Sequence, residues 1–117
     1  MFRQGKKPAV IFAESAQHRA RRALERAGYV PHTGMRYERR GEICAWSKDL
    51  PGGRHVHVQE VRWRDGVIAL FAHTEVKSGL GHVLSALRDR ANYSAGARTL
   101  RRDLTREGFF KPRPFPF

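Results

Sequence analysis

Two runs of strand-forming residues joined through Arg-Asp-Gly constrain the fold of this chain most strongly. The first run is RHVHVQEVRW, residues 54–63, and the second is VIALFAHTEV, residues 67–76. Their β-branched and aromatic residues favour strands, and an Asp-Gly pair between two such runs is typical of a tight hairpin turn. The sequence therefore predicts an antiparallel pair of strands over residues 54–76.

Two further short strands are expected upstream of the hairpin. They lie on either side of Arg40-Gly41 within TGMRYERRGEICAWSKD, residues 33–49, and LPGG forms the turn that follows. The stretch PAVIFA, residues 8–13, fits a short strand, but it also fits the first turns of a helix with Pro8 at the first helical position.

Three segments have the composition and spacing of helices. Residues 14–29 combine strong helix formers with Gly28 as the C-terminal cap, and leucines recur at helical spacing in residues 78–91 and 92–108. The predicted fold is an α+β two-layer sandwich with about four antiparallel strands, an N-terminal helix and two C-terminal helices.

The chain has 117 residues, which is the length of one domain. We expect a single α+β domain over residues 1–108 and an extended Pro/Phe-rich arm over residues 109–117, FFKPRPFPF, because three prolines exclude a helix or a central strand there. The arm either folds back over its own domain, which we favour, or docks on a protein partner or a second subunit.

Positive charge is the strongest bulk property of the chain. There are 23 Lys and Arg residues against 11 Asp and Glu residues, for a net charge of +12. The charge is concentrated at the ends, since residues 1–40 hold 10 basic and 3 acidic side chains and residues 98–117 hold 6 and 2. A balance of this kind indicates an acidic polymer as the partner, above all DNA or RNA.

Arginines form one face of each terminal helix. Helical spacing groups three of them on the first helix, on a different face from its apolar residues, and four on the last helix, on the side opposite the leucines. The alternative is a solvated face whose arginines pair with Asp103 and Glu107. Two acids cannot neutralise six basic residues, so we interpret these arginines as phosphate contacts: Arg19, Arg22, Arg26, Arg98, Arg101, Arg102 and Arg106.

The cellular compartment is predicted to be the cytoplasm. Cys44 is the only cysteine, so an internal disulfide is excluded, and there is no run of 18 apolar residues and no good secretory signal. No membrane partner is expected.

Histidines at positions 55 and 57 point to the same face of the predicted strand, because side chains alternate along a strand. With a three-residue loop, Arg64 to Gly66, His57 lies opposite His73 and His55 opposite Glu75. With a two-residue loop, His57 lies opposite Thr74 and the group scatters. The register of the hairpin therefore decides whether these side chains converge.

The pattern His55-Val56-His57 resembles the metal-binding motif of HUH endonucleases, the nickases of rolling-circle replication, plasmid mobilisation and some transposases. The resemblance implies that His55 and His57 lie on a central strand of an antiparallel sheet and bind a divalent metal, Mg or Mn. It also implies a third ligand, for which Gln59, His73 and Glu75 are candidates, and a nucleophilic tyrosine on a downstream helix, for which Tyr93 is the candidate. It is confined to these residues, and no family pattern is recognised across the chain as a whole.

Three classes of function fit these features. The leading hypothesis is a small basic nucleic-acid-binding protein without a cofactor and without enzymatic activity. The alternatives are a metal-dependent HUH-like nickase of single-stranded DNA, with metal ligands His55, His57 and His73 and nucleophile Tyr93, and a non-catalytic interaction module carried by a mobile element.

Overall fold

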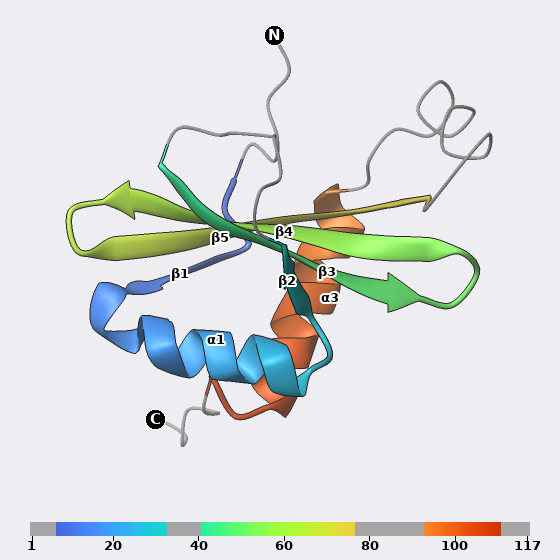
Figure 1. Cartoon of the computed structure of the whole chain (residues 1–117), viewed down its shortest axis with the longest axis horizontal. Coiled ribbons are helices and arrows are strands. Elements are labelled where there is room, and N and C mark those ends of the chain that lie inside the picture. Colours follow the sequence, from blue (N-terminus) through green and yellow to red (C-terminus); the bar gives the residue numbers. More distant parts are fainter. Residues whose placement is uncertain (1–6, 33–40, 77–92, 111–117) are drawn as a thin grey trace, which may run out of the picture.

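A five-stranded antiparallel sheet forms the centre of the molecule in the computed structural model, which describes residues 7–32, 41–76 and 93–110. The order of the strands is β1-β5-β4-β3-β2, so that β4 is the central strand (Figure 1). The elements in chain order are β1 (Val10–Ala13), η1, a 3-10 turn (Glu14–Ala16), α1 (Gln17–Arg26), β2 (Val30–His32), β3 (Glu42–Leu50), β4 (Arg54–Arg64), β5 (Val67–Val76) and α3 (Tyr93–Arg106).

The predicted α+β class is confirmed, and so are the strands β3, β4 and β5 and the helices α1 and α3. The expected number of about four strands is too low. Residues 10–13 form a strand and no helix, and Val30–His32 form an edge strand that the sequence did not indicate. A three-residue strand with Pro31 in its middle has little strand signal, and proline is tolerated there because the strand lies at the sheet edge. The strand expected within 33–40 and the helix expected within 78–91 lie outside the described residues.

The hairpin between β4 and β5 contains a β-bulge. Arg62 pairs with Ile68 and Arg64 pairs with Val67, so Trp63 is an extra residue on β4. The turn itself is Asp65-Gly66, with Gly66 at φ +71°. The turn therefore has two residues, as in the second alternative. Because of the bulge, however, His57 still pairs with His73, as was expected for a three-residue loop.

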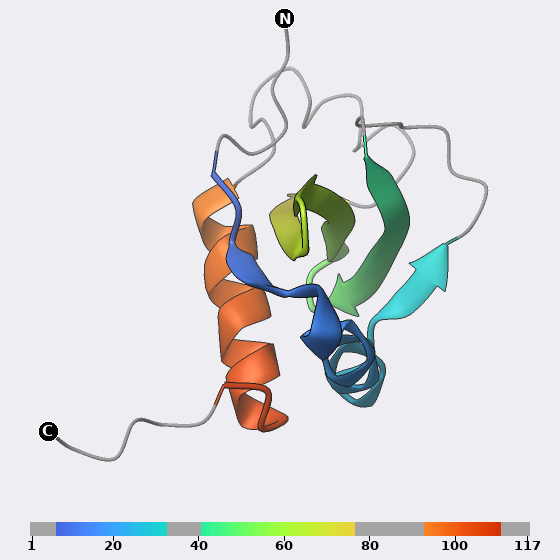
Figure 2. The same cartoon turned by 90° about the vertical axis from the view of Figure 1, so that its left-hand side faces the viewer.

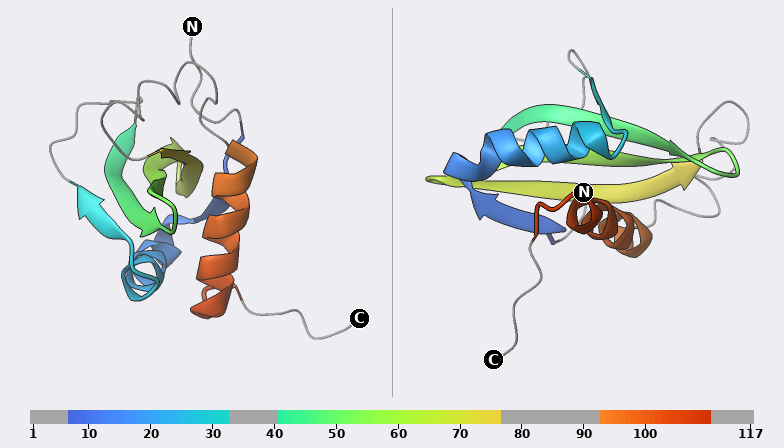
Figure 3. Two further views of the ribbon diagram at one scale, coloured as in Figure 1. Left: turned by 90° about the vertical axis from the view of Figure 1, so that its right-hand side faces the viewer. Right: turned by 90° about the horizontal axis from the view of Figure 1, so that it is seen from below.

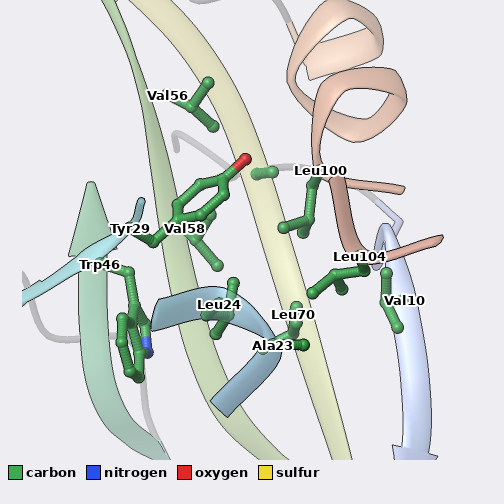
Figure 4. Packing of buried hydrophobic residues seen from close by; sticks show 11 residues of the cluster. Val10, Ala23, Leu24, Tyr29, Trp46, Val56, Val58, Leu70, Leu100 and Leu104 are labelled. Atoms are coloured by element: carbon green, nitrogen blue, oxygen red, sulfur yellow. The ribbon is translucent and has the colours of Figure 1, made fainter. Parts of the chain in front are cut away.

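The main core lies between one face of the sheet and the two helices. Val56, Val58 and Leu70 project from the central strands toward Leu24 of α1 and Leu100 and Leu104 of α3, all of them buried (Figure 4). Ala72 belongs to the same buried cluster. Phe109 and Phe110, the first two residues of the expected arm, also pack against this core, and residues 111–117 lie outside the described residues. The apolar faces predicted for both helices are the faces that are buried.

Helix α3 crosses the edge of β5 at a place that β1 does not cover. The pairing of β1 with β5 ends at Val10 and Leu70. Beyond that point Gly96 of α3 lies against the backbone of His73, where a Cβ atom on residue 96 would be 2.4 Å from the His73 Cα atom. β1 and α3 follow one another along this edge (Figure 3), and the N-terminal end of α3 is level with β4 and β5 while its C-terminal end is level with α1 (Figure 2). Tyr93 thereby reaches the sheet face that carries the histidines.

Candidate metal centre

Three histidines and a glutamate meet on the sheet face opposite the main core. His57 pairs with His73 and His55 pairs with Glu75 across β4 and β5. Because Val56 and Val58 point into the core, the alternating histidines of β4 point to the other face. Of the two registers considered from the sequence, the structure has the one in which these side chains converge.

Glu75 is in contact with all three histidines. Its Oε2 atom lies 2.9 Å from His55 Nε2 and 3.9 Å from His57 Nδ1, and its Oε1 atom lies 3.2 Å from His73 Nε2. The first and last of these distances are hydrogen-bond distances. The carboxylate therefore binds the cluster together from the end of β5.

A row of aromatic rings extends from this cluster to α3. The rings of His55 and His57 are stacked with centroids 4.5 Å apart, and the ring of His57 meets that of His73 at 5.4 Å. The ring of His73 then meets the ring of Tyr93 edge-on at 5.6 Å. Residues from β4, β5 and the first turn of α3 thus form one continuous side-chain group.

His55, His57 and Glu75 form a group of side chains that could hold a metal ion. Their donor atoms all lie within 4.8 Å of one another. Ligands bound at roughly 2.0–2.2 Å are at most about 4.4 Å apart across one ion, so these side chains would have to move to bind one. His73 was named from the sequence as the third histidine ligand. In the structure its ring contacts the other oxygen of Glu75, where it can hold the carboxylate in position.

The electrostatics of the cluster favour the protonation states that bind cations. Burial lowers the pKa of His57 to about 4, against the opposing effect of the Glu75 charge. Hydrogen bonding by His73, followed by that of His55, lowers the pKa of Glu75 to about 2 although burial acts in the opposite direction. At neutral pH, His57 is therefore a neutral imidazole and Glu75 an anion.

Tyr93, the candidate nucleophile, is the first residue of α3 and is half-buried, with its hydroxyl oxygen buried. Besides its contact with His73, it lines an open pocket together with Ser94 and Arg98 of the same helix and Lys7 from the segment before β1. Tyr93 thus lies between the histidine cluster and a basic pocket.

The seven arginines predicted to contact phosphates are all exposed. Some of them also make contacts within the chain. Arg26 bonds Glu107 through its Nε atom at 3.2 Å, the Arg19 guanidinium lies over the Phe109 ring at 5.1 Å, and Arg101 donates to the Ala9 carbonyl oxygen at 3.1 Å. These contacts join α1 to the end of α3 and α3 to the segment before β1.

The sequence did not indicate that two carboxylates, Glu60 and Asp103, are buried. Glu60 is 1% exposed and accepts hydrogen bonds from Gln17, Arg21 and the Trp46 indole. Strand alternation could have indicated it, because Glu60 shares the core face with Val56 and Val58.

Pairing of Asp103 with arginines of its own helix was the alternative interpretation of the sequence. Asp103 is instead 2% exposed and accepts hydrogen bonds from the Tyr29 hydroxyl and the Lys48 ammonium group, while Arg102 lies 3.6 Å away. Its charge is therefore engaged mainly by Tyr29 and Lys48, and of the arginine face it pairs with Arg102.

No protein-family model, curated protein or solved structure matches this chain. Within residues 7–32, 41–76 and 93–110, no helix has the length and apolar character needed to cross a membrane.

Proposed function

We propose that this protein is a divalent-metal-dependent endonuclease of single-stranded DNA that uses Tyr93 as its nucleophile. The observation that carries the proposal is the register of β4 and β5. It brings His55, His57, His73 and Glu75 together on the central strands, beside a tyrosine delivered by α3. The resemblance of His55-Val56-His57 to the HUH motif requires this arrangement of strand and helix.

The reaction is a transesterification. The Tyr93 phenol oxygen attacks the phosphorus atom, the bond from phosphorus to the 3′ oxygen breaks, and the downstream DNA fragment becomes linked to Tyr93 through its 5′ phosphate. The phenolic proton is released to water, and the leaving 3′ oxygen takes a proton from water. A divalent ion held by His55, His57 and Glu75 would polarise the scissile phosphate when bound. His73 positions Glu75 on one side and Tyr93 on the other.

The hydroxyl oxygen of Tyr93 is buried, so the proposed mechanism requires that this oxygen becomes accessible to DNA. A DNA strand must reach the phenol oxygen from the pocket that Tyr93 lines, which means that the side chain turns toward the pocket when DNA binds.

The test is cleavage of a single-stranded DNA library labelled at the 5′ or the 3′ end, in the presence of Mn²⁺. We expect cleaved fragments with the wild-type protein and their loss on adding EDTA. Tyr93→Phe and His57→Ala should abolish cleavage while DNA binding is retained. His18→Ala, which removes an exposed histidine of α1, is the matched control and should cleave normally. Equal cleavage by Tyr93→Phe and the wild type would exclude the mechanism.

Nucleic-acid binding without cleavage is the second candidate, and the exposure of all seven arginines on α1 and α3 favours it. This function needs the arginines but tolerates the loss of His57 and Tyr93. The logarithm of the binding constant should fall linearly with the logarithm of salt concentration, with a slope of about 0.7 per phosphate for single strands and about 0.9 for duplexes. Binding with this slope and no cleavage under any metal would favour this candidate.

A further inference from the structure

An open pocket of about 670 Å³ lies between the segment that precedes β1 and the first turns of α3. The segment before β1 contributes Lys7 and Pro8 to its lining. Helix α3 contributes Tyr93, Ser94, Arg98 and Arg101. The size falls within the range of about 300–1,000 Å³ that is common for sites of small ligands. It is therefore large enough to accept a nucleotide unit.

The pocket is strongly basic. Three of its eight described lining residues are cations and none carries a carboxylate. The Arg101 guanidinium is held in place by its hydrogen bond to the Ala9 carbonyl oxygen, 3.1 Å away, which uses one of its five N–H donors. Asp103, the acidic residue of α3, is buried against Tyr29 and Lys48 and does not neutralise the pocket.

The remaining lining is suited to a sugar or a base. Ala72 of β5 and Ala97 of α3 contribute small apolar side chains, and Pro8 adds a ring that is half-buried. Ser94 is exposed and offers a hydroxyl group at the first turn of α3. Cationic donors around a partly apolar hollow are the usual combination for a phosphate attached to an organic group.

We propose that the pocket of Lys7, Arg98 and Arg101 binds the phosphodiester group next to the scissile one on a single strand of DNA. The assignment to a DNA strand rests on the proposed function, whereas the anionic character of the ligand follows from the pocket alone. Tyr93 forms part of the pocket wall and its ring also contacts His73, so Tyr93 is the residue that connects the pocket with the histidine cluster.

Binding of a labelled single-stranded oligonucleotide, measured by fluorescence anisotropy over a salt series in EDTA, tests this proposal. The double variant Lys7→Gln/Arg98→Gln removes two charges from the pocket and keeps Arg101, which has a structural contact. We expect the affinity to fall at least about tenfold and the salt slope to fall by about 0.7 for each lost phosphate contact. The control is Arg62→Gln/Arg64→Gln, which removes two exposed charges at the hairpin turn.

Equal losses in the two double variants would overturn the proposal, because the effect would then be one of net charge. Competition by inorganic phosphate and by thymidine monophosphate distinguishes a pocket that binds a phosphate of a DNA strand from one that binds a free phosphate or nucleotide. Displacement of the oligonucleotide only at millimolar concentrations of either competitor supports a strand. Displacement of the oligonucleotide by far lower concentrations of thymidine monophosphate, with mononucleotide binding lost in Lys7→Gln/Arg98→Gln, would assign the pocket to a free nucleotide and overturn the proposal.

The same measurement separates this inference from the proposed function. It uses EDTA and needs no cleavage, so a pocket-specific loss of binding supports the inference even for a protein that cleaves nothing. Conversely, a metal-dependent cleavage that survives in Lys7→Gln/Arg98→Gln with unchanged DNA affinity would retain the proposed function and exclude the pocket.

Discussion

Glu75 connects the parts of the candidate site at the scale of single residues. One carboxylate contacts His55 and His57 through Oε2 and His73 through Oε1. Three histidines without an anion would repel a cation once any of them is protonated. In the proposed function, the carboxylate attracts the divalent ion, and the lowered pKa of Glu75, about 2, keeps it ionised at neutral pH.

Glu75→Gln is therefore expected to lower the affinity for Mn²⁺ by about tenfold or more, because the variant keeps the side-chain shape but removes the charge and one good oxygen ligand. Calorimetric titration with Mn²⁺ measures this. Glu14→Gln is the control, since Glu14 is an exposed carboxylate beside the hairpin turn that pairs with Arg62. A similar affinity for both variants would show that Mn²⁺ does not bind at this cluster.

The residues of the candidate site could be identified in the sequence, but the sequence could not show that their side chains lie close together. His55 and His57 were placed on one face by strand alternation alone. Whether His73 and Glu75 joined them depended on one residue of register, and that residue is the bulge at Trp63. An Asp-Gly turn is compatible with a regular ladder and with a bulged one, so sequence reasoning could state both registers but not choose between them.

At the scale of elements, the site depends on how α3 meets β5. The helix lies beside the part of the β5 edge that β1 leaves uncovered, and Gly96 allows its backbone to approach that of His73. The sequence indicated a helix with buried leucines, and those leucines are in the core. It gave no reason to place the first turn of that helix against a strand edge, because a glycine within a helix has several explanations.

We expect Gly96→Ala to destabilise the protein by about 1–3 kcal/mol, the usual cost of overpacking a close contact. An added Cβ atom would lie 2.4 Å from the His73 Cα atom and 2.5 Å from its backbone nitrogen, so α3 must move away from β5. Urea unfolding followed by circular dichroism measures the change, with Ser94→Ala on the exposed surface of α3 as the control. Because Tyr93 would move with the helix, the rate of cleavage should fall even under conditions in which the variant is still folded. A Gly96→Ala variant as stable as the wild type would contradict the close packing described for this edge.

At the scale of the whole molecule, the exposed surface of the described residues is more basic than the composition suggests. Glu60 and Asp103 are two of the 11 acidic residues, and both are buried in hydrogen-bonded networks. The arginines that the sequence analysis assigned to phosphate contacts are exposed on α1 and α3. Net charge and its distribution can be estimated from sequence, but which acids neutralise the surface depends on tertiary packing.

A molecule with this distribution is expected to attract a polyanion over a distance of about one Debye length and to hold it less tightly as salt rises. In the proposed function, this general attraction brings the strand to the molecule. The pocket of Lys7, Arg98 and Arg101 then positions it, and the cluster on β4 and β5 together with Tyr93 carries out the chemistry.

The most direct test of this account is the intact mass of the protein after incubation with single-stranded DNA of mixed sequence and Mn²⁺, followed by peptide mapping. The account predicts a covalent DNA fragment linked through its 5′ phosphate to the peptide that contains Tyr93, and no such species with EDTA or with Tyr93→Phe. DNA cleavage without any covalent protein species, or with a linkage at another residue, would contradict it.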